Sequence, residues 1–192
     1  MKMDFVIVGV GGQGTLLASR VLGALAGNLN VDCKVSEVHG MSQRGGSVVT
    51  YVRMGNDVAS PLVDFSGADY VLAFEQLEAL RALPYLKQGG TMIANAQRIM
   101  PMPVVTGTAQ YPDDACAQLK NRDDVIVIDA LTLAKEAGET RSVNVVLMGA
   151  LCAQMQGDPD LWRCSIEQSV PKKVLDVNLK AFDLGYEALK VN

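Results

Sequence analysis

The sequence is poor in residues that hold metals or redox centres. Its 192 residues include four cysteines and one histidine. The cysteines, Cys33, Cys116, Cys152 and Cys164, are widely spaced and form no C-x-x-C pair, so the spacing that binds an iron–sulfur cluster or a zinc ion is missing. We therefore predict no metal site in this chain. We expect the thiols to be reduced and mostly buried as small hydrophobic groups.

The sequence also lacks an excess of positive charge and a long apolar run. Seventeen Lys and Arg residues oppose 21 Asp and Glu residues, which gives a formal net charge of −4. No basic stretch is interleaved with aromatic residues, so nucleic-acid binding is not expected. Nowhere do about 18 uncharged apolar residues follow one another. Because the apolar start 1–12 contains Asp4, it does not fit a signal peptide, and we predict a cytoplasmic protein without membrane contact.

Apolar runs alternate with segments of helical spacing along most of the chain. Short apolar runs predict strands at 5–8, 33–38, 48–53, 68–74, 91–95, 104–109 and 125–129. Apolar residues at helical spacing predict helices at 15–26, 76–86, 113–120, 131–137, 144–156, 161–168 and 172–189. We expect Gly89 and Gly90 to end the helix 76–86, and Asp113 to cap the helix 113–120.

This alternation predicts an α/β fold. We expect a Rossmann-like, doubly wound and mostly parallel sheet that is covered by helices on both faces. Residues 1–192 form one domain, because the chain suits a single core and no segment has linker composition. The all-helical end of the chain is expected to pack on the sheet or on a partner.

A glycine fingerprint follows the first predicted strand and opens the first predicted helix. Residues 9–14 read GVGGQG and fit G-x-G-x-x-G. Such a turn brings backbone N–H groups and a helix N-terminus close to a diphosphate. Gly9, Gly11, Gly12, Gln13 and Gly14 are therefore candidates for binding CoA, FAD or NAD, although a tight turn that binds nothing has the same sequence.

Polar residues gather where the second predicted strand ends. Glu37 lies about where a Rossmann acid binds a ribose hydroxyl, although an ordinary carboxylate would also fit there. The loop after it carries the only histidine and an arginine, and its candidate site residues are His39, Ser42, Gln43, Arg44, Gly45, Gly46 and Ser47. A proton-transfer role for His39 and an anion-binding role for Arg44 are both open. We expect this loop and the glycine turn to face one crevice, at the carboxyl ends of adjacent parallel strands.

Three strings together resemble a known family. GVGGQG at 9–14, SEVHGMSQRGGS at 36–47 and NLKAFDLG at 178–185 are similar to the gamma family of pyruvate/ketoisovalerate/indolepyruvate:ferredoxin oxidoreductases, and most to its indolepyruvate type. The resemblance runs in order over essentially the whole chain. The twelve-residue string at 36–47 is far more specific than the glycine fingerprint.

The resemblance implies a subunit of a complex that oxidatively decarboxylates aryl pyruvates with CoA, giving an acyl-CoA, carbon dioxide and reduced ferredoxin. Thiamine diphosphate and 4Fe-4S clusters are expected in an α subunit, because this chain has neither a thiamine motif nor grouped cysteines. CoA is the ligand expected here, at the glycine turn, and the loop 39–47 would line the shared active site. We expect a hetero-oligomer and an inactive isolated chain, for which a homodimer stays open.

Two further hypotheses stay open. A free-standing NAD(P)- or FAD-binding oxidoreductase would share the glycine fingerprint, but it would not explain the polar loop. A purely structural subunit would leave the glycine turn empty, and the apolar run 145–155 would then serve as an interface helix. Hydrolase chemistry is disfavoured, because no second histidine is present to complete a catalytic group.

Overall fold

The computed structural model describes residues 2–40 and 45–190. The strands are β1 (Lys2–Val10), β2 (Asp32–His39), β3 (Ser47–Gly55), β4 (Ala68–Ala73), β5 (Leu86–Asn95) and β6 (Val125–Ile128). The α-helices are α1 (Thr15–Asn28), α2 (Gln76–Ala82), α3 (Met102–Val105), α4 (Ala115–Lys120), α5 (Ala130–Ala137), α6 (Val143–Gln154), α7 (Pro159–Ser169) and α8 (Leu175–Lys190). Short 3₁₀ turns cover Leu83–Tyr85, Thr140–Ser142 and Lys172–Val174.

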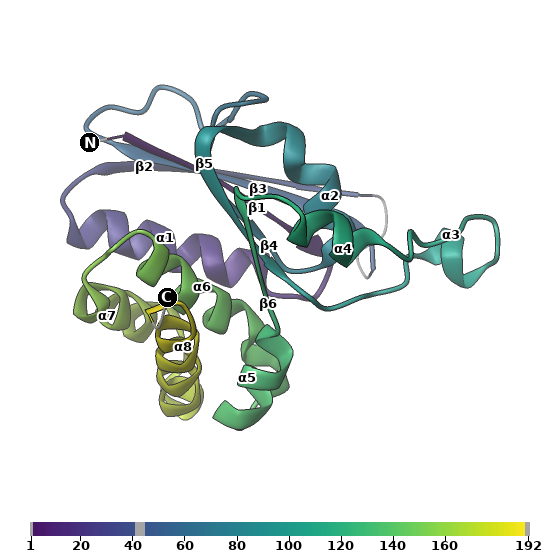
Figure 1. The fold of residues 1–192 in the computed structure, drawn as a ribbon. Helices are drawn as coiled ribbons and strands as arrows, with labels where there is room; N and C mark the ends of the chain where they lie inside the picture. Colours follow the sequence, from purple (N-terminus) through teal and green to yellow (C-terminus); the bar gives the residue numbers. More distant parts are fainter. Residues whose placement is uncertain (1, 41–44, 191–192) are drawn as a thin grey trace.

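The six strands of the described residues form one mixed sheet in the order β2-β3-β1-β4-β5-β6 (Figure 1). The pairs β1–β4, β4–β5 and β5–β6 are parallel, whereas β3 is antiparallel to both β1 and β2. The expected α/β class is confirmed. The expectation that β1 and β2 are neighbouring parallel strands is wrong, because the antiparallel strand β3 lies between them. The reason is the short connection 40–46, because a crossover to a parallel strand needs about a dozen residues or more.

Helices cover both faces of the sheet. Figure 1 shows α2 and α4 on one face, and α1, α5, α6, α7 and α8 on the other. Successive side chains of β1 point to opposite faces, so Val6 and Val8 belong to the core beneath α2, while Phe5 and Ile7 belong to the larger core. No helix in the described residues is long and apolar enough to cross a membrane.

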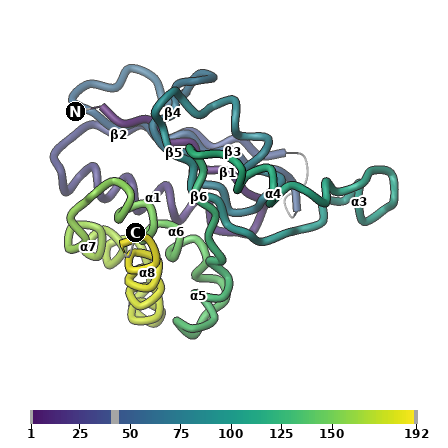
Figure 2. The backbone as a smooth tube through the Cα atoms, in the orientation of Figure 1, coloured from purple at the N-terminus to yellow at the C-terminus, as the bar shows by residue number. Residues whose placement is uncertain are grey.

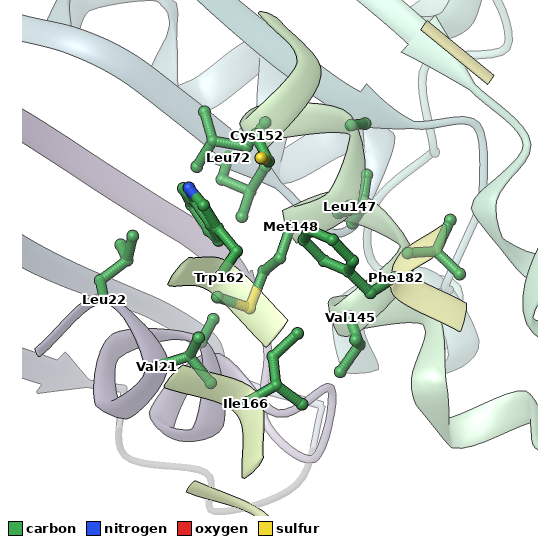
Figure 3. Packing of buried hydrophobic residues seen from close by; sticks show 14 of the residues in the cluster. Val21, Leu22, Leu72, Val145, Leu147, Met148, Cys152, Trp162, Ile166 and Phe182 are labelled. Carbon is green, nitrogen blue, oxygen red and sulfur yellow. The ribbon is translucent and has the colours of Figure 1, made fainter. Parts of the chain in front are cut away.

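The C-terminal helices build the larger core in two layers. Figure 3 shows Trp162 of α7 and Met148 of α6 beside Val21 and Leu22 of α1. The outer helix α8 packs on α6, where it buries Phe182, and on α5. The tube in Figure 2 shows α8 outside α6 and away from the sheet. The expected packing on the sheet therefore holds for α6, which contacts β5, while α8 packs mainly on the helices α6 and α5.

The glycine pair does not end the helix before it. α2 stops at Ala82, the 3₁₀ turn Leu83–Tyr85 follows, and Gly89 and Gly90 lie inside β5. A Cβ atom on Gly90 would lie 2.9 Å from the carbonyl oxygens of both Ala68 and Asp69. The pair therefore permits a close approach of β5 to β4, where their register shifts.

Two predictions in the segment 98–120 are wrong. The expected strand 104–109 is absent, and the short helix α3 and a tight turn replace it, because the hydroxyls of Thr106 and Thr108 donate hydrogen bonds to the Pro103 carbonyl. Asp113 does not cap α4. The helix begins after Asp114, which makes no side-chain cap, and Asp113 forms an ion pair with Arg98 instead.

The four thiols are free, but their burial differs from the expectation. Only Cys152 is buried, Cys33 and Cys116 are partly exposed, and Cys164 is exposed. The expectation of mostly buried cysteines is therefore wrong. Burial raises the pKa of the Cys152 thiol to about 12.

We expect iodoacetamide to modify Cys164 in the folded protein and to reach Cys152 only after unfolding. The reagent needs a thiolate and access, and Cys152 offers neither, since it is buried and its pKa is raised. Peptide mass spectrometry at increasing urea concentrations measures both sites, with a Cys164→Ser variant as the control. Equal labelling of the two thiols in the folded state would contradict this prediction.

Candidate functional site

The side chain of Gln13 holds the glycine turn in place through two hydrogen bonds. The Gln13 side chain accepts a hydrogen bond from the Val10 N–H at 2.8 Å and donates one to the Phe74 carbonyl at 2.9 Å. It thus joins the ends of β1 and β4. Gly12 has a φ of +100°, and no atom of the described residues lies within 4 Å of its Cβ direction, whereas a Cβ atom on Gly14 would meet Asn144 at 2.5 Å. Gln13 and Gly14 therefore shape the turn, and Gly12 is its open residue.

The glycine turn lies beside the ends of β1 and β4, and the helices that follow these two strands lie on opposite faces of the sheet. The helix after β1 covers one face of the sheet, and the helix after β4 covers the other (Figure 1). Such a switch point is the usual ligand site of an open α/β sheet. A cleft of about 160 Å³ opens here, and its lining residues are Gly12, Gln13, Gln97, Ile99, Thr140, Arg141 and Val143.

The structure brings the polar loop to the same edge of the sheet. The Gly11 N–H donates a hydrogen bond to the Gly46 carbonyl at 2.8 Å. The two segments thus share an edge of the sheet, but they do not face one crevice in the described residues, because Gly12 and Gln13 line one cleft and the loop end 45–47 lines another. β1 and β2 are also not adjacent, because β3 lies between them. The Ser47 hydroxyl donates to the Glu78 carboxylate at 2.5 Å. The candidates Ser42, Gln43 and Arg44 lie outside the described residues.

Glu37 and His39 interact with each other on β2. The Glu37 carboxylate accepts hydrogen bonds from Thr50 at 2.9 Å and Thr15 at 3.3 Å, and it lies 2.7 Å from Nε2 of His39. The Glu37 side chain is 14% exposed and that of His39 is 60% exposed. The carboxylate of Glu37 thus joins β2, β3 and the start of α1, while His39 faces outward.

A larger groove was not foreseen from the sequence. It has a volume of about 430 Å³ and lies between the end of the polar loop, α2 and the segment 101–112. Its lining residues are Gly45, Gly46, Ser47, Leu77, Glu78, Arg81, Pro101, Met102, Pro103, Val104, Ala109, Gln110 and Pro112. The sequence could have indicated this groove. Polar residues directly follow the predicted strand 68–74, and the end of that strand lies at the same edge of the sheet as the glycine turn.

A buried carboxylate holds the wall of this groove. Glu75 is 1% exposed, and it accepts hydrogen bonds from the backbone N–H groups of Leu77 and Glu78, from the Ile99 N–H and from the Tyr111 hydroxyl. Burial and the bond to Glu75 raise the pKa of Tyr111, so its hydroxyl keeps its proton and donates. Glu75 thus fixes both ends of the segment 99–111.

Residues 2–40 and 45–190 contain no group of three or more His, Cys, Asp or Glu side chains that could hold a metal ion. The polar side chains at the carboxyl edge of the sheet are instead suited to binding an organic anion. Arg81 and Arg141 supply the positive charge, and the glycine turn supplies open backbone.

The fold and this edge of the sheet define a class of α/β domain with a glycine turn at a sheet switch point, the place where ligands of such sheets usually bind. The family model "Pyruvate ferredoxin/flavodoxin oxidoreductase" matches residues 4–188, and the chain belongs to this family. The chain is 45% identical to indolepyruvate oxidoreductase subunit IorB of Pyrococcus horikoshii, over 98% of this chain and 96% of the relative. The resemblance stated from the sequence is confirmed.

Solved structures share the fold. The gamma subunit of a keto/oxoacid ferredoxin oxidoreductase from Geobacter sulfurreducens superposes with a TM-score of 0.74 at 21% identity, over 99% of both chains. The 2-oxoglutarate:ferredoxin oxidoreductase from Magnetococcus marinus, solved with 2-oxoglutarate, coenzyme A and succinyl-CoA bound, gives a TM-score of 0.73 at 19% identity. That match covers 100% of this chain but 31% of the other, so the same fold also occurs as part of a longer chain.

Proposed function

We propose that this chain is the β, or gamma-type, subunit of an indolepyruvate:ferredoxin oxidoreductase. The complex would decarboxylate an aryl 2-oxoacid, join the acyl group to the CoA thiol, release carbon dioxide and pass the electrons to ferredoxin. The observation that carries this proposal is the 45% identity to an indolepyruvate oxidoreductase subunit over nearly the full length of both chains. A cytoplasmic location stays a prediction from composition.

CoA is the ligand that we propose for the glycine turn. No described atom lies within 4 Å of the Cβ position of Gly12, which would let a diphosphate approach its backbone, and Arg141 and Thr140 line the same cleft. The N-termini of α1 and α6 meet there, since the Asn144 side chain donates to the Gly14 carbonyl at 3.2 Å, and both helix dipoles favour an anion. The Magnetococcus enzyme with this fold was solved with CoA bound, which supports the choice.

The partner would be an α subunit that holds thiamine diphosphate and 4Fe-4S clusters. The wide spacing of the four cysteines in this chain supports that division. We place the loop 39–47, with Ser42, Gln43 and Arg44, against the thiamine pocket of the partner. Exposed apolar side chains of the arm 98–112, among them Met102 and Val105, suit a contact with another protein. Figure 1 shows this arm, labelled α3, projecting from the domain.

The proposal is tested by reconstitution with the partner subunit. We expect the isolated chain to give no turnover with an aryl pyruvate, CoA and ferredoxin, and the complex of both subunits to be active. Assaying each subunit alone under the same conditions provides the control. Turnover by this chain alone, or an active partner that does not need it, would contradict the proposal.

Arg141→Gln is expected to weaken CoA binding about tenfold, because a hydrogen bond to a charged group contributes roughly 1.5–3 kcal/mol. Calorimetry with CoA measures the change. Arg122→Gln is the matched control, since Arg122 pairs with Asp124 at the opposite, amino-terminal end of β6. Equal CoA affinity for Arg141→Gln and the wild type would remove Arg141 from the site.

A further inference from the structure

The groove between α2 and the segment 101–112 has a composition that suits one kind of ligand. Its walls are mostly apolar, formed by residues such as Leu77, Met102, Val104 and Pro112. Of the described residues that line it, Glu78 and Arg81 are the charged ones. An apolar groove with a few placed polar groups is the usual form of a small-molecule site.

Glu78 is buried and holds the polar side of the groove in place. It is 4% exposed, one carboxylate oxygen accepts the Ser47 hydroxyl at 2.5 Å, and the other accepts Nη1 of Arg81 at 2.7 Å. A buried carboxylate without partners would be strongly disfavoured. Glu78 therefore fixes both the end of the polar loop and the guanidinium of Arg81.

Arg81 is placed to meet a ligand. Its side chain is 56% exposed although one nitrogen is held by Glu78. A guanidinium carries several N–H donors in a rigid plane, so one bond to Glu78 leaves others that can pair with a carboxylate or phosphate. The apolar walls of the groove would strengthen this pairing by reducing contact with water.

We infer that this groove binds an anionic group carried on an apolar or aromatic body, with Arg81 pairing with the anion. Glu78 is a positioning residue that holds Arg81 and Ser47. The inference rests on the proposed function, in which two substrates have this chemistry. One is the aryl 2-oxoacid with its carboxylate. The other is CoA, which carries a 3′-phosphate besides the diphosphate that we propose for the glycine turn.

The test uses the reconstituted complex and steady-state kinetics for both substrates. Arg81→Gln is expected to raise KM for one substrate about tenfold, with kcat changed by less than about twofold. Arg81→Lys should give a smaller rise, because it keeps the charge but loses the planar donors. Glu78→Gln should raise the same KM, since Arg81 and Ser47 donate to different carboxylate oxygens, and glutamine keeps an oxygen at only one of these two positions.

Arg20→Gln is the matched control, because Arg20 is exposed on α1, on the other face of the sheet. Thermal melting of each variant shows whether it is folded. A KM change for the aryl pyruvate identifies the carboxylate as the bound anion, and a change for CoA identifies its phosphates. Either result supports the inference.

Unchanged KM values for both substrates in an active Arg81→Gln complex would overturn the inference and leave the proposed function intact. A loss confined to kcat would overturn it as well. An inactive wild-type complex would contradict the proposed function instead. In that case KM cannot be measured, and calorimetry of the wild-type and Arg81→Gln chains with CoA and with the aryl pyruvate tests the inference by measuring binding affinity. Affinity lost in Arg81→Gln supports it, and unchanged or absent binding overturns it.

Discussion

Gly185→Ala is expected to lower the free energy of unfolding by roughly 2–3 kcal/mol, as overpacking of a core commonly does. A Cβ atom at Gly185 would lie 1.9 Å from the carbonyl oxygen of Val146 on α6. The reverse contact is equally close, with a Cβ atom at Gly149 lying 2.0 Å from the Phe182 carbonyl oxygen. The backbones of α6 and α8 touch at this crossing, so any side chain would push α8 away.

Urea unfolding followed by circular dichroism measures the change at Gly185. Gly23→Ala is the matched control, because Gly23 lies inside α1 and nothing is within 4 Å of its Cβ direction. That variant should be more stable than the wild type by about 0.5–1 kcal/mol, since alanine favours a helix. Wild-type stability of Gly185→Ala would contradict the close crossing of α6 and α8.

Glu75→Gln is expected to lower the free energy of unfolding by roughly 3 kcal/mol, because it disturbs a buried network of hydrogen bonds to a charged group. The two oxygens of Glu75 accept four hydrogen bonds from three parts of the chain. An amide has one acceptor oxygen, so its NH₂ group would face N–H or O–H donors. The wall 99–111 of the larger groove would loosen with it.

Thermal melting and limited proteolysis measure this effect. Tyr111→Phe is the control, because it removes one donor and leaves the Glu75 carboxylate with its backbone partners. We expect a loss of about 1 kcal/mol for Tyr111→Phe, and cleavage within 99–111 to increase most in Glu75→Gln. Wild-type stability for Glu75→Gln would show that the carboxylate does not hold this segment.

The local sequence predicted a helix or strand correctly wherever a single apolar pattern covered the whole element. The apolar run at 5–8, the glycines that follow it and the helical spacing after Thr15 predicted β1, the turn and α1. The same holds for β6 and α5, where Asp129 caps the helix by accepting from Thr132. Hydrophobic periodicity marks these elements, the Asp129 cap adds to it in α5, and no distant contact overrides the local pattern.

Predictions from the local sequence were wrong where contacts with a distant part of the backbone determine the secondary structure. Gly90 predicted the end of a helix, but it is needed because β4 passes too close for a Cβ atom. The valines at 104–105 predicted a strand, but no neighbouring strand pairs with them in the described sheet, and a local turn closes instead. Propensity could not show which strands would be neighbours.

For the candidate site, the sequence marked the glycine turn and the polar loop, and only the structure showed which other residues lie beside them. Gln13 was expected to bind a cofactor, which stays a prediction, and the structure adds that its side chain joins β1 to β4. That role depends on Phe74, which is far away in the sequence. The proposed ligand-binding arginines, Arg81 and Arg141, come from segments that no motif marked.

By itself the sequence determined the α/β class, the glycine turn and the family, because these depend on residue order and short-range patterns. Only the tertiary structure decided the antiparallel insertion of β3, the helix crossing at Gly149 and Gly185, and the groove held by Glu75 and Glu78. Each of these depends on atoms that are distant along the chain and meet only when the sheet and its helices have packed.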